Sequence, residues 1–225
     1  MPGDRLVRRA LVEGLVITAS ILLAFTLDRW WDVQQEAAHI EELEFALVAE
    51  FEATVSELQA VRSIHSARTR AAQALVDLAP DAATSLGGDS LLVLFSAALF
   101  PTMTDPPRGA LSSVISAGDL RLIRGQELRS RLAGWENRLE DMWHTETNIR
   151  ELLLNRLSED VAHATPFPDQ GGVVDDQFVA ALRGVPIRNH LKQVVLITDI
   201  VLNENQALQD EVRQILGMLR QEVGS

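Results

Sequence analysis

The feature that most constrains this chain is an apolar run near its N-terminus. It extends from Ala10 to Leu27 (ALVEGLVITASILLAFTL), 18 residues in which Glu13 is the only charged side chain. Because an α-helix rises 1.5 Å per residue, the run would extend over about 27 Å, close to the hydrocarbon thickness of a bilayer. The run therefore predicts a single transmembrane helix.

Two other interpretations stay open at this point. A cleaved signal peptide ends in a small-residue cleavage site, whereas this run passes directly into Asp28-Arg-Trp-Trp-Asp32. A helix buried in a protein core is the stronger alternative, because 18 residues is at the short end of the lengths that span a membrane. The residues that flank the run distinguish between these possibilities.

The charges around the run favour a membrane anchor with a cytoplasmic N-terminus. Arg5, Arg8 and Arg9 precede the run, whereas no Lys or Arg occurs between Arg29 and Arg62. The cytoplasmic flanks of membrane helices carry an excess of positive charge. The asymmetry therefore predicts that the chain after the anchor is extracytoplasmic.

Aromatic residues mark the far end of the predicted anchor. Trp30 and Trp31 follow the apolar run directly, where an interfacial aromatic belt is expected. The residues predicted to lie at the membrane interface are Arg8, Arg9, Arg29, Trp30 and Trp31. The predicted organisation is a cytoplasmic N-terminus (1–9), a transmembrane anchor in contact with the lipid bilayer (10–31) and an extracytoplasmic helical-bundle domain (32–225).

Helical periodicity dominates the rest of the sequence. Apolar residues recur at spacings of three and four, and no stretch shows the alternation of a strand. The predicted helices cover about 33–79, 90–100, 110–117, 126–164, 175–183 and a last long segment after Pro186. We expect an all-α fold in which the N-terminal transmembrane helix continues into an antiparallel bundle of three long helices with short connecting helices, with a coiled-coil-like period.

Two polar residues fall on the apolar seams of this expected bundle. Glu146 continues the seam of the 126–164 helix beyond Met142, and Asn205 lies on the seam of the last helix. An antiparallel register places the two side chains at the same level, which predicts a structural hydrogen bond between them in the core. The alternative is that the helix rotates after Met142 and exposes Glu146 to solvent.

The composition argues against several classes of function. The formal net charge of −12 makes nucleic acid an unfavourable partner, because phosphate binders concentrate Lys and Arg on one face. Cysteine is absent, which excludes disulfides and thiolate chemistry but leaves the compartment open. Phosphate-binding loops, nucleophile elbows and paired-histidine zinc motifs are absent as well.

The five histidines are the strongest candidate metal ligands in the sequence. Glu36-Ala-Ala-His39 and Asp160-Val-Ala-His163 have the spacing of ligand pairs in di-iron bundles, but in so acidic a chain solvated charge is the favoured explanation of both. The remaining histidines are His65, His144 and His190. We predict no catalytic, cofactor-binding or metal site.

The sequence also resembles a protein family. The stretch Gly14-Leu-Val-Ile through Leu23-Ala24 to Trp30-Trp31, joined to the turn Ser116-Ala-Gly-Asp-Leu-Arg-Leu-Ile123 before a long helix, is similar to a family of uncharacterised bacterial single-pass inner-membrane proteins with a domain of unknown function. The resemblance implies a bacterial inner membrane, with the helical domain in the periplasm or otherwise outside the cytoplasm. It implies no activity.

These observations favour an interaction protein over an enzyme. We expect a membrane-anchored extracytoplasmic helical scaffold that forms homo-oligomers or engages another envelope protein. The alternative is an extracytoplasmic sensor that binds a small ligand and acts through a partner protein. A dry, filled bundle favours the scaffold, whereas a cavity lined by Trp and His favours the sensor.

Overall fold

The computed structural model describes residues 3–78, 88–164 and 176–223. For residues 3–17, 19, 88, 176 and 223 it describes the backbone but not the side chain. The elements are α1 (Gly3–Val76), α3 (Gly88–Leu99), α4 (Gly109–Ala117), the 3₁₀ turn η1 (Asp119–Leu122), α5 (Gln126–Glu151), the π-helical segment η2 (Leu152–Leu157), α6 (Ser158–Ala164), α7 (Asp176–Leu182) and α8 (Val185–Val223). All regular structure over these ranges is helical, which confirms the predicted all-α class. The predicted loop 80–89 lies almost wholly outside the described residues.

The chain divides into two compact units, residues 1–46 and 47–225, which are treated separately. No helix offers, over the residues that the structure describes, a stretch long and apolar enough to cross a membrane. The side chains of residues 10–17, within the predicted anchor, lie outside that description. Helix α1 has no break between residues 33 and 76, as predicted, and ends three residues before the predicted Ala79.

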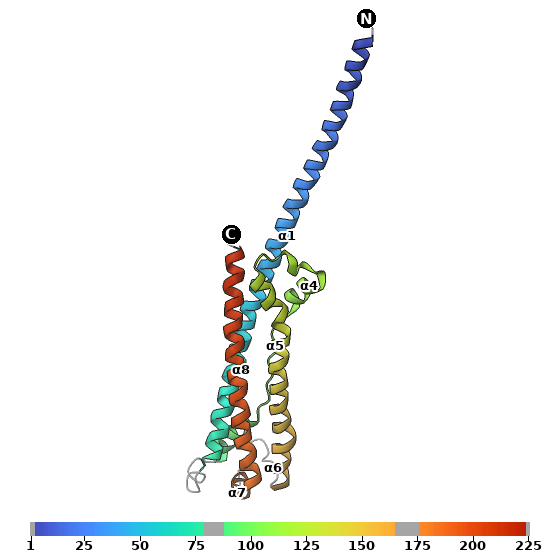
Figure 1. Ribbon diagram of the computed structural model, residues 1–225. Coiled ribbons are helices and arrows are strands. Elements are labelled where there is room, and N and C mark those ends of the chain that lie inside the picture. The colour runs from blue at the N-terminus through green and yellow to red at the C-terminus, as the bar shows by residue number, and fades with distance from the viewer. Residues whose placement is uncertain (1–2, 79–87, 165–175, 224–225) are drawn as a thin grey trace. The chain divides into compact units, whose positions relative to one another are not determined.

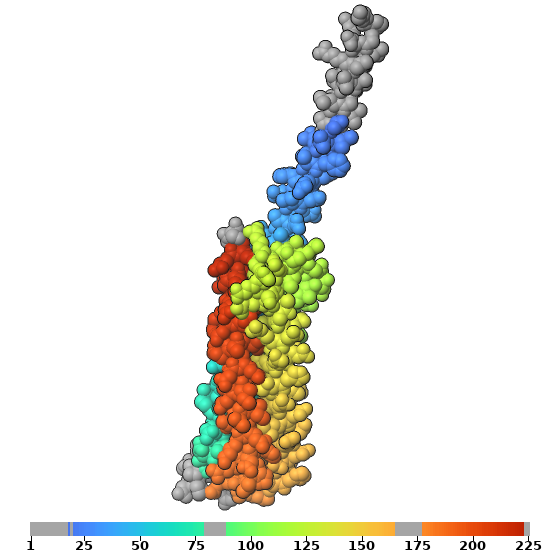
Figure 2. All heavy atoms as spheres, in the orientation of Figure 1, coloured from blue at the N-terminus to red at the C-terminus, as the bar shows by residue number. Residues whose placement is uncertain are grey.

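The second unit is a bundle of three long helices: residues 47–76 of α1, then α5 with η2 and α6, then α8 (Figure 1). Helix α8 runs opposite to α5, and their side chains pack together along their length (Figure 2). Two hydrogen bonds show this direction. Thr145, late in α5, donates to Glu204, whereas the amide of Gly125, just before α5, donates to Glu222 near the end of α8. The predicted antiparallel packing of these two helices is confirmed.

Helices α1 and α5 are parallel, so the prediction that neighbouring long helices alternate in direction was wrong for this pair. Phe51 stacks edge-on against Trp135 with ring centroids 5.4 Å apart, and farther along both helices His65 contacts Glu146. The reason is the connection between them. Residues 100–108, which we call the strap, carry the chain back along α1, so that α5 starts at the same end of the bundle as residue 47.

The core follows heptad spacing on all three helices. Every predicted seam position of α8 is buried: Leu191, Val194, Thr198, Val201, Asn205, Leu208, Val212, Ile215 and Leu219. The predicted α5 seam from Leu128 to Met142 is buried as well. A wider turn, which the sequence analysis did not anticipate, interrupts this helix at η2, where the Ser158 hydroxyl donates to the Leu153 carbonyl.

Carboxylates from distant helices satisfy two helix N-termini. Glu50 of α1 accepts from the amides of Ala110 and Leu111 at the start of α4. Glu222 of α8 accepts from Gly125 just before α5, where a Cβ atom would lie 2.8 Å from the Glu222 carboxylate. These carboxylates supply the acceptors that free helix N-termini require and hold the N-terminus of α4 and that of α5 against the bundle.

Candidate functional site

The most unusual site in the bundle is a buried polar cluster formed by His65 and Arg68 of α1, Thr104 of the strap and Glu146 of α5. His65, Arg68 and Glu146 are 0% exposed, and Thr104 is 1% exposed. Charged residues are seldom fully buried unless they are paired and hydrogen-bonded. We refer to these four residues as the Glu146 cluster.

Hydrogen bonds join the charged members through a neutral histidine. Arg68 Nη1 lies 2.8 Å from His65 Nδ1, and His65 Nε2 lies 3.2 Å from Glu146 Oε1. A guanidinium can only donate, so Nδ1 accepts and the imidazole proton is on Nε2, from which it is donated to Glu146. The three side chains therefore form a directed chain from a cation to an anion.

The same carboxylate holds the strap in place. Thr104 donates its backbone amide to Glu146 Oε2 and its hydroxyl to Oε1, both at 2.8 Å. Arg68 Nη2 donates to the Phe100 carbonyl at 2.5 Å. Because the strap lacks helical hydrogen bonds of its own, these contacts pair backbone groups of Phe100 and Thr104 that would otherwise need water.

Electrostatics make the cluster dependent on all its members. Burial lowers the pKa of the Arg68 guanidinium to about 10, and the negative charge of Glu146 opposes this effect. The side chain therefore remains cationic at neutral pH and balances Glu146. Removing either charge would leave the other buried without compensation.

The geometry of the cluster suits a structural role better than catalysis. Its hydroxyl, imidazole and carboxylate are sealed from solvent and already hydrogen-bonded to one another. A catalytic base or nucleophile must reach a reacting atom of a substrate. The arrangement can fix the register of α1 and α5 and hold the strap between them.

A second set of contacts holds the strap from the outside. Trp143 Nε1 donates to the Thr104 carbonyl at 2.5 Å, and the guanidinium carbon of Arg108 lies 4.8 Å from the centre of the Trp143 ring. The indole thus bonds through its polar edge and binds a cation on its face. Together with the Glu146 cluster, it joins the strap to α5.

The two predicted polar seam residues are both buried, at 0% exposure each. The alternative that Glu146 turns toward solvent is therefore wrong. Among the described residues, no hydrogen bond joins Glu146 to Asn205. Each side chain bonds to other groups instead. Asn205 donates to the Leu58 carbonyl at 3.0 Å and accepts from Gln209 at 2.7 Å. The antiparallel register places the residues at the same level, but each points toward a different partner.

Sequence reasoning missed His65 and Arg68, although a signal for both exists. The buried positions of α1 step by four and three without interruption: Leu47, Phe51, Thr54, Leu58, Val61, His65, Arg68, Ala72 and Leu75. Following apolar residue types alone leads to Ile64 instead, which is only half-buried. Continuing the spacing regardless of polarity, as was done for Glu146, would have placed His65 and Arg68 in the core.

The predicted interfacial residues lie in the first unit. Trp30 and Trp31 are 59% and 65% exposed, and Arg29 is exposed as well. Arg8 and Arg9 lie outside the residues whose side chains are described. The described side chains of this predicted interface, Arg29, Trp30 and Trp31, are therefore not covered by other residues of the first unit.

Neither spacing suggestive of a metal site leads to a ligand group. Asp160 Oδ2 lies 2.9 Å from Nδ1 of His190 on α8. Over the described ranges, no three His, Asp or Glu side chains are placed to hold a metal ion.

Comparisons with known proteins found no relative of this chain. No family model matches the chain, and no curated protein or solved structure matches it either.

Proposed function

We propose that this chain is a membrane-anchored helical interaction protein. Residues 10–31 would span a bacterial inner membrane, with residues 1–9 in the cytoplasm and residues 32–225 outside it. The observation that carries the proposal is the exposure of large apolar side chains on all sides of α1: Ile21, Leu22, Leu23, Phe25, Leu27, Trp30 and Trp31 are 50–68% exposed.

Exposure on every side is what separates a lipid-facing helix from one that packs on a protein. Successive helical residues are about 100° apart, so the exposed apolar residues from Ile21 to Trp31 together point around the whole circumference. A helix that is apolar all round needs an apolar environment on all its faces. Exposed tryptophans at its end and the three leading arginines support the orientation.

The interior of the bundle supports an interaction role over a sensor. Three of the aromatic and imidazole groups that could have lined a ligand cavity make contacts within the bundle instead. Trp135 is 1% exposed against Phe51, Trp143 is bonded to the strap, and His65 is enclosed in the Glu146 cluster. The outer face of α8 offers a contact surface, because Leu196 and Ile200, one turn apart, are 64% and 46% exposed.

A reporter experiment tests the topology. A reporter enzyme that is active only outside the cytoplasm, fused after Ser225, is expected to be active in the unaltered protein. Replacing Arg5, Arg8 and Arg9 with Glu should reduce or invert this signal, because it removes the positive flank. Activity of a cytoplasmic reporter at the same position in the unaltered protein would rule out the proposed orientation.

A pull-down tests the interaction role. The protein purified from solubilised membranes is expected to bring down a second copy or another envelope protein. The double variant Leu196→Glu, Ile200→Glu should lose that partner without a change in thermal unfolding, whereas Asn189→Glu on the same helix should retain it. A protein that purifies alone and monomeric in its unaltered form would contradict the proposal.

A further inference from the structure

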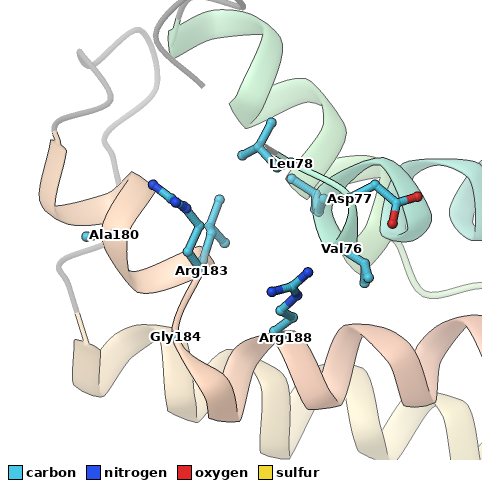
Figure 3. A pocket seen from close by; sticks show the side chains of 9 residues that line it. Val76, Asp77, Leu78, Ala180, Arg183, Gly184 and Arg188 are labelled. Atoms are coloured by element: carbon cyan, nitrogen blue, oxygen red, sulfur yellow. The ribbon is translucent and has the colours of Figure 1, made fainter. Parts of the chain in front are cut away.

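A pocket of about 490 Å³ lies where α1 ends beside α7 and the start of α8 (Figure 3). Its lining residues are Leu75, Val76, Asp77, Leu78, Ala180, Leu182, Arg183, Gly184 and Arg188. This volume falls in the range of small-ligand sites. The pocket belongs entirely to the second unit and is separate from the Glu146 cluster.

The pocket combines an apolar floor with a cationic rim. Leu75, Val76 and Leu182 are buried members of the bundle core. Arg183 and Arg188 are exposed, and Figure 3 shows the Arg188 guanidinium extending from α8 toward Val76. Leu78 is half-buried, so a ligand in this space would meet its alkyl side chain and the edge of Val76 beside the guanidinium groups.

Neither guanidinium has a hydrogen-bond or ion-pair partner among the residues that the structure describes. The acidic residue in the lining is Asp77, whose carboxylate accepts from Gln73 at 2.7 Å. Arginine presents a planar set of donors that matches a carboxylate or phosphate in two-point geometry. The rim therefore offers donors without a matching anion in the described part of the chain.

The surrounding sequence is locally basic in an acidic protein. From Gln177 to Thr198 there is no Asp or Glu, whereas Arg183, Arg188 and Lys192 fall in the same stretch. The chain as a whole carries a formal net charge of −12. Basic side chains therefore outnumber acidic ones in this stretch, which favours a small anion over a cation here.

We propose that this pocket binds a small organic oxyanion with a short apolar tail, of which a short-chain carboxylate is the simplest member. The oxyanion is held by Arg188 and Arg183, and the tail covers the half-buried Leu78 and the edge of Val76. This site does not depend on the membrane anchor or on the interaction surface of α8. A competing explanation is that Arg188 only offsets the negative C-terminal end of α1.

Titration calorimetry with hexanoate distinguishes the two explanations. The full chain is reconstituted in lipid nanodiscs, and empty nanodiscs of the same composition give the blank. Saturable binding is expected, with affinity lowered roughly tenfold or more by Arg188→Gln, since charge-assisted hydrogen bonds contribute about 1.5–3 kcal/mol. Arg213→Gln, at an exposed arginine of the same helix, should leave the affinity unchanged. Acetate and hexan-1-ol should each bind more weakly than hexanoate.

Three outcomes would overturn the proposal. They are the absence of saturable hexanoate binding, equal binding of hexan-1-ol, and an Arg188→Gln variant that melts at a lower temperature but binds hexanoate as before. Thermal unfolding followed by circular dichroism checks that each variant folds. If Arg188→Gln does not fold, Arg183→Gln provides the same comparison from the other side of the pocket.

Discussion

Residues 18–33 of α1 and the core of the bundle show opposite relations between polarity and burial. In the first region, large apolar side chains from Ile21 to Trp31 are at least half exposed. In the second, His65, Arg68 and Glu146 are completely buried. The proposed membrane contacts would cover the apolar segment, because exposed apolar surface costs about 25 cal/mol per Å² in water. The buried polar groups depend instead on hydrogen bonds and opposite charges within the bundle.

The largest expected effect comes from placing the same charge in both regions. Leu132→Arg, at a core position that is 0% exposed, should destabilise the bundle by at least about 4 kcal/mol, because it buries an unpaired cation. Leu22→Arg should leave the unfolding of the bundle unchanged and reduce the fraction of protein in the membrane, since Arg in a spanning helix costs up to about 3 kcal/mol.

Urea denaturation followed by tryptophan fluorescence, together with fractionation of membranes, measures both effects. A Leu22→Arg variant that destabilises the bundle as strongly as Leu132→Arg would show that the two regions are buried in the same way.

Breaking the Glu146 cluster should have the next largest effect. Glu146→Leu removes the acceptor of His65 and of both Thr104 donors and leaves Arg68 unbalanced. A loss of about 3–5 kcal/mol in the free energy of unfolding is expected.

The matched control for this change is Glu52→Leu. Glu52 pairs with Arg220 at 2.7 Å, but both side chains are more than half exposed. Such pairs contribute between about 0 and 1 kcal/mol. Equal losses in the two variants, measured by urea denaturation, would contradict the conclusion that the cluster depends on its burial.

Asn205→Leu should have a smaller effect, of about 1–3 kcal/mol, because it leaves the Leu58 carbonyl and the Gln209 amide without their partner. Since Asn205 and Glu146 share no partner, the losses of the two Leu variants should add to within about 0.5 kcal/mol. A double-mutant cycle measures this. A coupling energy well above that value would restore the direct Glu146–Asn205 interaction that the sequence suggested.

Heptad spacing allowed much of the bundle to be predicted. It identified every seam position of α8 and the burial of Glu146, because a side chain's position on a helix depends on spacing alone. The C-terminal stop of α4 was also predictable, since Gly118 has the positive φ of 76° that favours glycine after a helix.

The relative direction of the helices and the hydrogen-bond partners of the buried polar residues could not be predicted from spacing. The parallel packing of α1 and α5 depends on the strap, whose path is set by contacts distant in sequence, such as those of Arg68 with Phe100 and of Thr104 with Glu146. Likewise, spacing placed Glu146 and Asn205 at one level but could not say that His65 and Leu58 of a third helix would bind them.

The smallest expected effect concerns a carboxylate at the edge of the buried region, and it has the opposite sign. Glu204 accepts from Thr145, yet burial raises the pKa of its carboxyl, and the charges of Asp141 and Glu146 act in the same direction. One of its oxygens is buried without a hydrogen-bond partner among the described residues. The charged form is therefore less favourable in the folded protein than in the unfolded chain.

Glu204→Gln should consequently stabilise the protein at pH 7, by up to about 0.5 kcal/mol. A raised pKa in the folded state means that the folded protein binds the proton more tightly, so the penalty of the wild-type carboxylate disappears as the pH falls through the raised pKa toward the ordinary value of 4.5. The advantage of the variant should vanish in the same range. Urea denaturation at pH 7 and at pH 4 measures it, and a gain that persists unchanged at pH 4 would mean that the amide packs better for reasons unrelated to charge.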